Sequence, residues 1–582
     1  DKAMAFQVSP GVQVKEIDAT GVIPAVSTSI GGFTGAFNWG PVEEITLVSS
    51  EDNMASIFST PADSDTAKYF LTAASFLKYG NALKVVRTVG TAARNANGGG
   101  QTNIVIKNEA SYDNASLGSA GEFVAKYPGV LGNSLAVDVC YSSSSDAAFS
   151  AWGFKEEFDS APTTSDSAKA LGYDGVTAVG GVTRALANDE LHVVVYDATG
   201  EITGTPGTLL EKFAYLSQAS DAKDSSGSSV YYADAITNRS KWVSFAGHLG
   251  ATSSAGSTFN AVGGAFPGNG TTIATDIMGN GVDDNTLEVA DIQRGLDLFN
   301  DSETVDVNLL FAYPDTNGSR DIGNYLISVA NNRKDCMAFI SPPIEDTTQG
   351  SDPLANVLAY VNDGTGITSS SYASIDSGAV YVYDKYNDTY RWIGAAGLTA
   401  GLCANTDQVA DAWFSPAGVN RGQLRGVTKL AFNPTQAQRD SLYKARVNPI
   451  VSFPGQGTML YGDKTLLSRP SAFDRINVRR LFITLEKAIS TAAKAQLFEF
   501  NDEFTRSQFR NMVEPFLRDV KGRRGLTDFL VTCDETNNTG QVVDSNSFVA
   551  DIYIKPARSI NFITLNFIAT RTGVDFSEVS GG

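Results

Sequence analysis

The first strong pattern in the chain is a helical repeat of apolar side chains followed by a short strand-like run. Between Asp65 and Tyr79, apolar residues recur at intervals of three and four, and Gly80 supplies a stop signal. The run from Leu83 to Val89 is rich in β-branched residues, which is typical of a buried strand. The pattern therefore predicts a helix and then a strand, the beginning of an α/β unit.

The same alternation resumes much later in the chain. We predict helices at Asp291–Phe299 and Ile322–Asn331 and strands at Val305–Tyr313 and Met337–Ser341. The sequence in between consists of Ser-, Gly- and Asn-rich loops that separate short β-branched runs such as Leu191–Tyr196. We therefore expect a middle α/β domain over 21–90 and 276–434, interrupted by a strand-rich outer insertion over 91–275.

The C-terminal part is the least loop-rich. One apolar stripe at helical spacing runs over Val478–Leu497, and a second predicted helix, Asn501–Val520, is opened by Asp502 and Glu503 at its positive end. We expect a further domain over 435–582, so the fold class is α/β (α+β) with several domains.

Both ends of the chain carry the pattern of extended strands. After a Pro-Gly turn signal, apolar and polar residues alternate over Ser9–Ile17, so residues 1–20 are expected to form a linker strand. Apolar residues fall on both faces of Ser559–Ile568, which predicts a strand covered on both sides. Such strands can complete a sheet in a neighbouring molecule, because strand addition satisfies the backbone groups that a sheet edge leaves open. The residues that we assign to this addition are Val12, Val14, Ile17, Ile560, Phe562, Ile563, Leu565 and Phe567.

Composition and charge restrict the function classes. Hydrophobic residues make up 42% and charged residues 19% of the 582 residues, as in a folded protein. The net charge of -20 argues against a nucleic-acid partner, because phosphate binding needs a basic surface. Residues 435–582 hold 19 basic and 16 acidic residues, about +3, which leaves about -23 for residues 1–434. This asymmetry is either chance variation between domains or a sign that the C-terminal part faces an acidic partner.

A search for catalytic chemistry finds no convincing site. His192 and His248 have no close ligand partners, and no GxSxG nucleophile motif occurs. In the loop Gly457–Thr465, Asp463 occupies the position of the phosphate-binding lysine of a P-loop, where its charge would repel phosphate. We therefore predict no catalytic, cofactor-binding or metal residues. A hydrolase that uses scattered carboxylates is the least favoured function.

The acidic cluster and the cysteines give only weak evidence for a metal or redox site. The cluster of Asp276, Asp283 and Asp284 lacks the ligand spacing of an EF-hand, so a solvated loop is favoured over a calcium site. The four cysteines form no CxxC pair and are expected to be reduced core residues. No charged and apolar leader opens the sequence and no apolar run is long enough to span a bilayer, so we expect a protein made in a cytoplasm that does not insert into membranes.

Several long motifs resemble the tail sheath proteins of large contractile-tailed phages. In the second half of the chain they are Tyr383–Asp388 with Arg391–Trp392, Gly401–Asp407, Trp413–Gly422, Tyr461–Thr465, Phe473–Phe482 and Ile554–Asn561. In the first half they are Ser9–Val12, Phe37–Pro41 and Lys126–Asn133. The resemblance covers nearly the whole chain, and motifs of this length in this order are specific. Where the larger family members carry an additional outermost domain, this chain has only a short loose stretch near 90–121.

The resemblance implies an assembly protein of a virion. Family members are expected to build an inner domain from both chain ends, with middle and outer domains layered outward, and to stack as six-fold rings into a helical tube. The implied partners are other copies of the chain, the tail tube, and the baseplate and tail terminator proteins. It implies a contractile sheath that is metastable when extended and drives the tube through the host envelope for genome ejection.

The resemblance also implies that a C-terminal helix faces the tube, and Asn501–Val520 is our candidate. The basic residues that we assign to this contact are Arg506, Arg510, Arg518 and Lys521. The alternative is a solvated stripe that balances Asp502, Glu503 and Glu514.

Two other functions stay open at this point. The sheath of a phage-derived bacteriocin or secretion-type machine would share these motifs. A surface-binding adhesin module would explain the Ser-, Thr- and Gly-rich loops, although the missing export signal opposes it.

Overall fold

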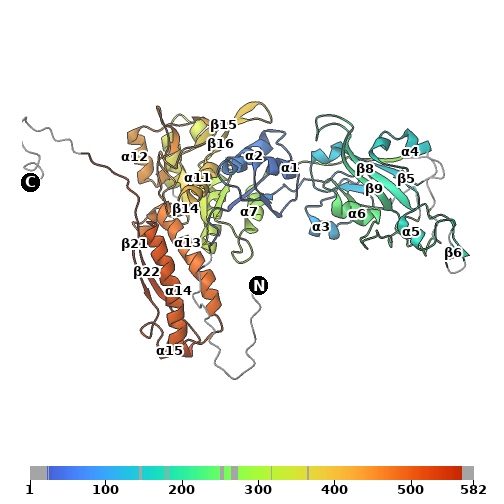
Figure 1. Cartoon of the computed structure of the whole chain (residues 1–582). Helices are drawn as coiled ribbons and strands as arrows, with labels where there is room; N and C mark the ends of the chain where they lie inside the picture. The colour runs from blue at the N-terminus through green and yellow to red at the C-terminus, as the bar shows by residue number, and fades with distance from the viewer. Residues whose placement is uncertain are drawn as a thin grey trace, which may run out of the picture. The chain divides into compact units, whose positions relative to one another are not determined.

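The computed structural model describes residues 23, 25–142, 147–176, 178–179, 182–248, 254–263, 266, 273–315, 318–362 and 366–565. The chain divides into two compact units. The terminal unit takes in Asp1–Val26, Ala410–Ser415 and Ser471–Gly582, and the central unit takes in Ser27–Val409 and Pro416–Pro470. The fold is a mixed α/β arrangement with several sheets (Figure 1).

A seven-stranded sheet organises the central unit. Its strand order is β18 (Val447–Asn448), β14 (Ala373–Asp376), β13 (Met337–Ile340), β12 (Leu309–Ala312), β1 (Gly31–Gly35), β3 (Leu83–Arg87) and β2 (Ile45–Val48). All neighbours are parallel except β2, which pairs antiparallel with β3. The parallel strands are buried almost throughout, as expected for a sheet covered on both faces. Because β18 joins this sheet, residues up to Pro470 belong to the central unit.

Helices cover both faces of this sheet. On one side, α2 (Ser64–Leu77) packs with α11 (Ala396–Val409), and on the other α7 (Val289–Asp297) packs with α8 (Ser319–Arg333). A Cβ atom on Gly31 would lie 2.8 Å from Phe76 of α2, and one on Gly32 would lie 2.8 Å from Val307, which follows α7. Glycine at these positions lets both layers approach β1 closely. The predicted helices at 65–79, 291–299 and 322–331 are confirmed as α2, α7 and α8.

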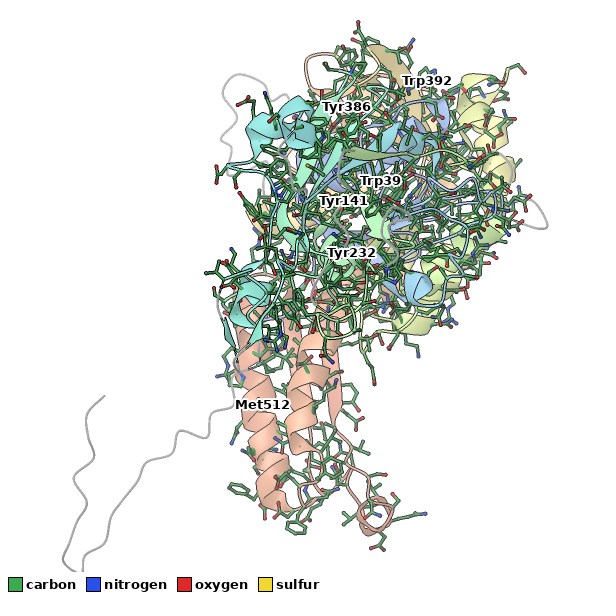
Figure 2. All side chains as sticks on the ribbon, turned by 90° about the vertical axis from the view of Figure 1, so that its right-hand side faces the viewer. Trp39, Tyr141, Tyr232, Tyr386, Trp392 and Met512 are labelled. Atoms are coloured by element: carbon green, nitrogen blue, oxygen red, sulfur yellow. The ribbon has the colours of Figure 1, made fainter. Side chains whose placement is uncertain are left out.

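Smaller elements complete the central unit outside the insertion. The short helices are α1 (Glu51–Phe58), α9 (Ile344–Thr348), α10 (Pro353–Asn362) and α12 (Gln436–Lys444). A three-stranded sheet has the order β16 (Thr389–Gly394), β15 (Ala379–Asp384) and β17 (Val427–Leu430), and β19 (Ile450–Phe453) pairs with β20 (Gly457–Leu460). Tyr386 lies in the turn between β15 and β16, and Trp392 lies on β16 (Figure 2). The Tyr386 hydroxyl donates to Glu51 of α1 at 3.0 Å, so one motif quoted above ties the hairpin to a helix.

The insertion after β3 contains its own antiparallel sheet. The strand order is β11 (Ile273–Ile277), β5 (Leu135–Tyr141), β8 (Glu190–Asp197) and β9 (Thr208–Ser217). One face of this sheet packs with α6 (Tyr232–Arg239) into a core that includes Trp39, Tyr141 and Tyr232 (Figure 2). The strand predicted at Leu191–Tyr196 is confirmed as β8. The remaining elements are α3 (Glu109–Asp113), β4 (Phe123–Ala125), α4 (Ala147–Ala151), α5 (Asp166–Ala170), β6 (Ala178–Val179), β7 (Val182–Thr183) and β10 (Val243–Phe245).

One buried arginine joins the insertion to the central sheet. The Arg87 guanidinium, at the end of β3, is fully buried and donates to the carbonyl oxygens of Phe37 at 2.8 Å, Gly40 at 2.9 Å and Pro128 at 2.8 Å. Burial lowers the pKa of Arg87 to about 10, with Asp283 opposing that change. The motifs Phe37–Pro41 and Lys126–Asn133 are therefore brought together by hydrogen bonds from one side chain.

The terminal unit is built from a long helical pair and a two-stranded sheet. The helices are α13 (Ile476–Ala493) and α14 (Glu503–Gly522), and β21 (Leu526–Thr532) pairs antiparallel with β22 (Asp551–Pro556) (Figure 1). The short helix α15 (Gly540–Asp544) lies in the connection between the two strands. The predicted helices at 478–497 and 501–520 are confirmed, with α13 ending four residues early at Ala493. Ile23 and Trp413 join the core of this unit.

Candidate functional site

The helix α14 buries one regular stripe against its neighbours. Asp502 caps its start by accepting from the Thr505 backbone N–H at 2.8 Å. Phe509, Val513 and Leu517 recur at four-residue spacing and are buried with α13 and the two strands. Met512 lies beside this stripe and is half-buried (Figure 2). The unit therefore has a core of its own, which fixes the two strands that follow.

The β21–β22 sheet covers this core with one face only. Val531 and Ile552 pack into the core, whereas Leu530 and Tyr553, which are paired across the strands, are each 59% exposed on the other face. Within the described part of the chain the sheet has two strands, so both of its outer edges keep unpaired backbone groups. Sequence reasoning missed these strands and the pair Leu530 and Tyr553, although the apolar and β-branched run Phe529–Thr532 was a usable signal.

The segment that follows β22, residues 558–565, is here called the C-terminal arm. It contains no helix or strand, and Ile560, Phe562, Ile563 and Leu565 are 79%, 88%, 78% and 70% exposed. We expected a strand covered on both sides here. In the single subunit, residues 558–565 form no strand, and their four large apolar side chains are exposed rather than covered.

The other residues assigned to strand addition lie outside the described residues. They are Val12, Val14 and Ile17 near the N-terminus and Phe567 beyond the end of the arm.

The four basic residues assigned to α14 do not share one surface. Arg506 is 9% exposed on the face that Phe509 buries, and its Nη1 donates to Asn501 Oδ1 at 3.4 Å. Arg510 is half-buried, whereas Arg518 and Lys521 are exposed. Lys521 pairs with Asp528 at 3.2 Å. The exposed positive charge of α14 is therefore concentrated toward its C-terminal end.

The two histidines have structural partners. The backbone N–H of Tyr215 donates to His192 Nδ1 at 3.1 Å, and His192 Nε2 lies 2.9 Å from the Ser160 carbonyl oxygen, so the proton is assigned to Nε2. His248 Nδ1 lies 3.1 Å from the Tyr232 hydroxyl.

The acidic residues considered above hold separate backbone segments. Asp276 accepts from the Phe123 N–H at 3.2 Å, Asp283 from the Val130 N–H at 2.8 Å and Asp284 from the Ala92 N–H at 2.8 Å. Asp463 is 3% exposed and accepts from the Tyr443 hydroxyl at 3.3 Å. In the part of the chain that the structure describes, no group of three His, Cys, Asp or Glu side chains could hold a metal ion.

All four cysteines are buried. Burial raises the pKa of Cys140 to about 12 and also raises that of Cys533. A search of the described residues finds no helix long and apolar enough to cross a membrane.

Comparison with protein families assigns three parts of the chain, on either side of the insertion. Residues 28–88 match the Tail sheath protein Gp18 domain III N-terminal region, residues 286–466 the Phage tail sheath protein central domain, and residues 468–570 the Phage tail sheath C-terminal domain. The boundary between the last two matches, at 466–468, lies beside the unit boundary at Ser471.

Similar proteins and structures extend this assignment to the whole chain. The tail sheath protein of Vibrio phage KVP40 is 35% identical, with 99% of this chain and 100% of the relative covered, and that of Enterobacteria phage T4 is 34% identical, with 99% of each covered. The sheath tail protein from Desulfitobacterium hafniense has a TM-score of 0.52 at 13% identity, covering 95% of this chain and 97% of that one. The anti-feeding prophage helical sheath in its contracted state has a TM-score of 0.50 at 13% identity, covering 97% and 100%. The chain therefore belongs to the phage tail sheath protein family, the non-enzymatic structural subunits of the contractile tail of the virion.

Proposed function

We propose that this sheath subunit polymerises by adding its terminal strands to sheets of neighbouring copies, so that stacked six-fold rings surround a tail tube. The observation that carries the proposal is the exposed apolar C-terminal arm of a unit whose two-stranded sheet has open edges. An arm with Phe562 and Ile563 in water is unfavourable, and strand addition would bury both side chains and pair the backbone. A half-dozen added backbone hydrogen bonds at about 0.5–1.5 kcal/mol each would contribute several kcal/mol per joint.

Strand addition of this kind produces an open polymer. The donor arm and the acceptor sheet are different surfaces of one subunit, so the contact is heterologous, and a rotation that does not close generates a helical filament. The similarity to the anti-feeding prophage protein, which is a helical sheath, supports this arrangement. An inner domain built from both chain ends is the corresponding proposal for the terminal unit, with the insertion as the outer domain.

Contraction follows if the strand-addition contacts between subunits persist while the helical arrangement of the subunits changes. The extended sheath would be a trapped state, and release at the baseplate would let the subunits move, ring by ring, to a denser packing that buries more surface. At about 25 cal/mol per Å², even a modest gain per subunit becomes large over a whole tail. The contraction would drive the tail tube through the host envelope for genome ejection, with no nucleotide as energy source.

The proposed partners are the tail tube, the baseplate and the tail terminator. On α14, the residues available to an acidic tube surface are Arg510, Arg518 and Lys521. Arg506 would support this contact from inside the unit rather than by touching the tube, because it is buried beside Phe509. The competing interpretation of these charges is a solvated surface that balances the acidic residues of the same helix.

Two truncations test the proposal. Removal of residues 1–20, and separately of residues 558–582, should leave a folded subunit, because the described arm contributes no helix or strand to the unit. Negative-stain microscopy of the full-length chain should show tubes, and both truncated chains should give none. Normal tubes from either truncated chain would show that the missing end is not a linker.

A further inference from the structure

The base of the C-terminal arm is held by one buried asparagine. Asn477, in the first turn of α13, is 5% exposed, and its Nδ2 donates to the carbonyl oxygens of Trp413 and Ala557, each at 3.4 Å. Ala557 is the last residue before the arm, and its N–H donates to the Gly525 carbonyl at 3.1 Å. These contacts bring together three segments that are far apart in the sequence at the point where the arm begins.

The Trp413 segment is itself tightly fixed. The Trp413 indole N–H donates to the Arg523 carbonyl at 3.1 Å, and the Arg523 guanidinium lies 4.9 Å from the centre of the Trp413 ring. Arg523 also pairs with Asp411 at 2.8 Å. Residues Ala410–Ser415 belong to the terminal unit, although the chain on either side of them belongs to the central unit. Over this short segment the chain belongs to the terminal unit, and the contact between Trp413 and Asn477 places the segment at the base of the arm.

One hydrogen-bonding group at this joint is unused. In the described structure Asn477 Oδ1 is buried without a hydrogen-bond partner, and both Nδ2 contacts are longer than a usual amide hydrogen bond. By contrast, both amide groups of Asn538, at the other end of the β21–β22 sheet, are hydrogen-bonded. Its Nδ2 donates to the Val549 carbonyl at 2.7 Å and its Oδ1 accepts from the Val549 N–H at 2.9 Å.

We infer that Asn477, with Trp413, forms a collar that sets the direction in which the arm leaves the subunit. This inference rests on the proposed strand addition. A fixed direction lowers the entropy lost when the arm finds its acceptor. Asn477 is therefore a positioning residue for assembly, and it does not itself have to touch the neighbouring copy.

The test compares Asn477→Ala with Asn538→Ala in the full-length chain. Both substitutions remove a buried amide of the same unit, so both should lower its thermal stability. At equal concentrations of folded protein, Asn477→Ala should raise the concentration needed for tubes by about tenfold or more, and Asn538→Ala should change it much less. In mixtures with wild type, a minor fraction of folded Asn477→Ala should also shorten the tubes, because a subunit with a misdirected arm still accepts a neighbour but does not extend to the next.

The outcomes separate this inference from the proposed function. If Asn477→Ala assembles like Asn538→Ala, the collar has no positioning role. If removal of residues 558–582 leaves assembly intact, the strand-addition proposal itself fails. Should Asn477→Ala not fold, Trp413→Phe replaces it; this change removes the hydrogen bond to Arg523 and shortens a ring that also packs in the core and against the Arg523 guanidinium. The inference then requires a loss of assembly at equal concentrations of folded protein, and normal assembly would overturn it.

Discussion

The central sheet and the C-terminal arm expose their apolar side chains to very different degrees. Phe33, in β1 of the central sheet, is fully buried, whereas Phe562, in the C-terminal arm, is 88% exposed. The charged Arg87 is buried in the central unit, but three backbone carbonyls accept from it. The central unit thus satisfies this buried charge within one chain. The arm exposes an apolar sequence that a neighbouring copy would cover on strand addition, and this difference is what we expect of a subunit whose ends take part in assembly.

The strongest way to break this comparison is a pair of matched substitutions. Phe33→Asp places a carboxylate inside the sheet and should lower the free energy of unfolding by about 4 kcal/mol or more. Phe562→Asp should change that free energy by less than about 0.5 kcal/mol. It should still raise the concentration needed for tubes by at least about tenfold, because the buried apolar contact is lost. Denaturant unfolding and sedimentation of tubes measure the two effects.

The comparison fails if the two phenylalanines behave alike. A destabilised Phe562→Asp subunit would mean that the arm packs on its own unit. Unchanged assembly would mean that the exposed apolar surface of the arm is not a contact.

Substitution of Arg87 tests how much the stability of the central unit depends on the hydrogen bonds of one buried charge. Arg87→Met keeps much of the side-chain volume but leaves the carbonyls of Phe37, Gly40 and Pro128 without their donor. We expect a loss of about 3–5 kcal/mol in denaturant unfolding, because unsatisfied buried groups are costly. Arg518→Met, at an exposed position of α14, is the control and should cost less than about 0.5 kcal/mol. If the two variants are equally stable, the hydrogen bonds of Arg87 do not contribute to the stability of the central unit.

A buried acid gives the central unit a defined pH dependence. Asp376 is fully buried at the end of β14 and accepts from Ser341 Oγ at 2.5 Å and from the Gly378 N–H at 3.0 Å. Burial raises the pKa of Asp376 to about 7. The folded state therefore holds the proton more tightly, and the stability contributed by this group is complete below about pH 4 and is lost as the pH rises through about 7.

Asp376→Asn should remove this dependence. Wild type should lose on the order of 2–4 kcal/mol of unfolding free energy across this window, and the variant much less. Asp301→Asn is the control, because hydrogen bonding from Thr304 lowers the pKa of the exposed Asp301, so its titration lies at lower pH. Urea unfolding between about pH 5 and about pH 8 makes the measurement. If the unfolding free energy of Asp376→Asn still falls with pH as in wild type, other groups cause this dependence.

The insertion should show the smallest and opposite effect. Burial lowers the pKa of His192, and protonation would also remove the Nδ1 acceptor for the Tyr215 N–H. The contribution of His192 to stability is therefore present above about pH 6.5 and is lost as the pH falls below it. His192→Gln should weaken this loss of stability at acidic pH. Unfolding is measured by the fluorescence of Trp152, which stacks on Phe158 beside His192. An unchanged loss of stability in this variant would contradict the assignment.

Periodicity predicted the elements whose packing follows from local sequence. The stripes of α2, α13 and α14 and the β-branched run of β3 are visible because regular spacing places apolar residues on one side. The two-residue strand β18 could not be predicted, because its place in the sheet depends on pairing with β14 and not on its own pattern.

The candidate site was predictable in part. The apolar arm was visible from residues such as Phe562 and Ile563, but its exposure in a single subunit was not. Helical spacing placed Arg506 and Arg510 near each other, yet it does not reveal which side of α14 meets the core, and Arg506 is buried. The collar was hidden because the Asn477 side chain contacts backbone carbonyls from distant segments.

A cryo-microscopy map of assembled tubes tests the central claim most directly. We predict that Ile560–Leu565 of each subunit lies along an edge of the β21–β22 sheet of another copy, with backbone hydrogen bonds between the two chains. A map in which the arm folds back onto its own terminal unit, and in which no strand passes from one copy to the next, would contradict the account.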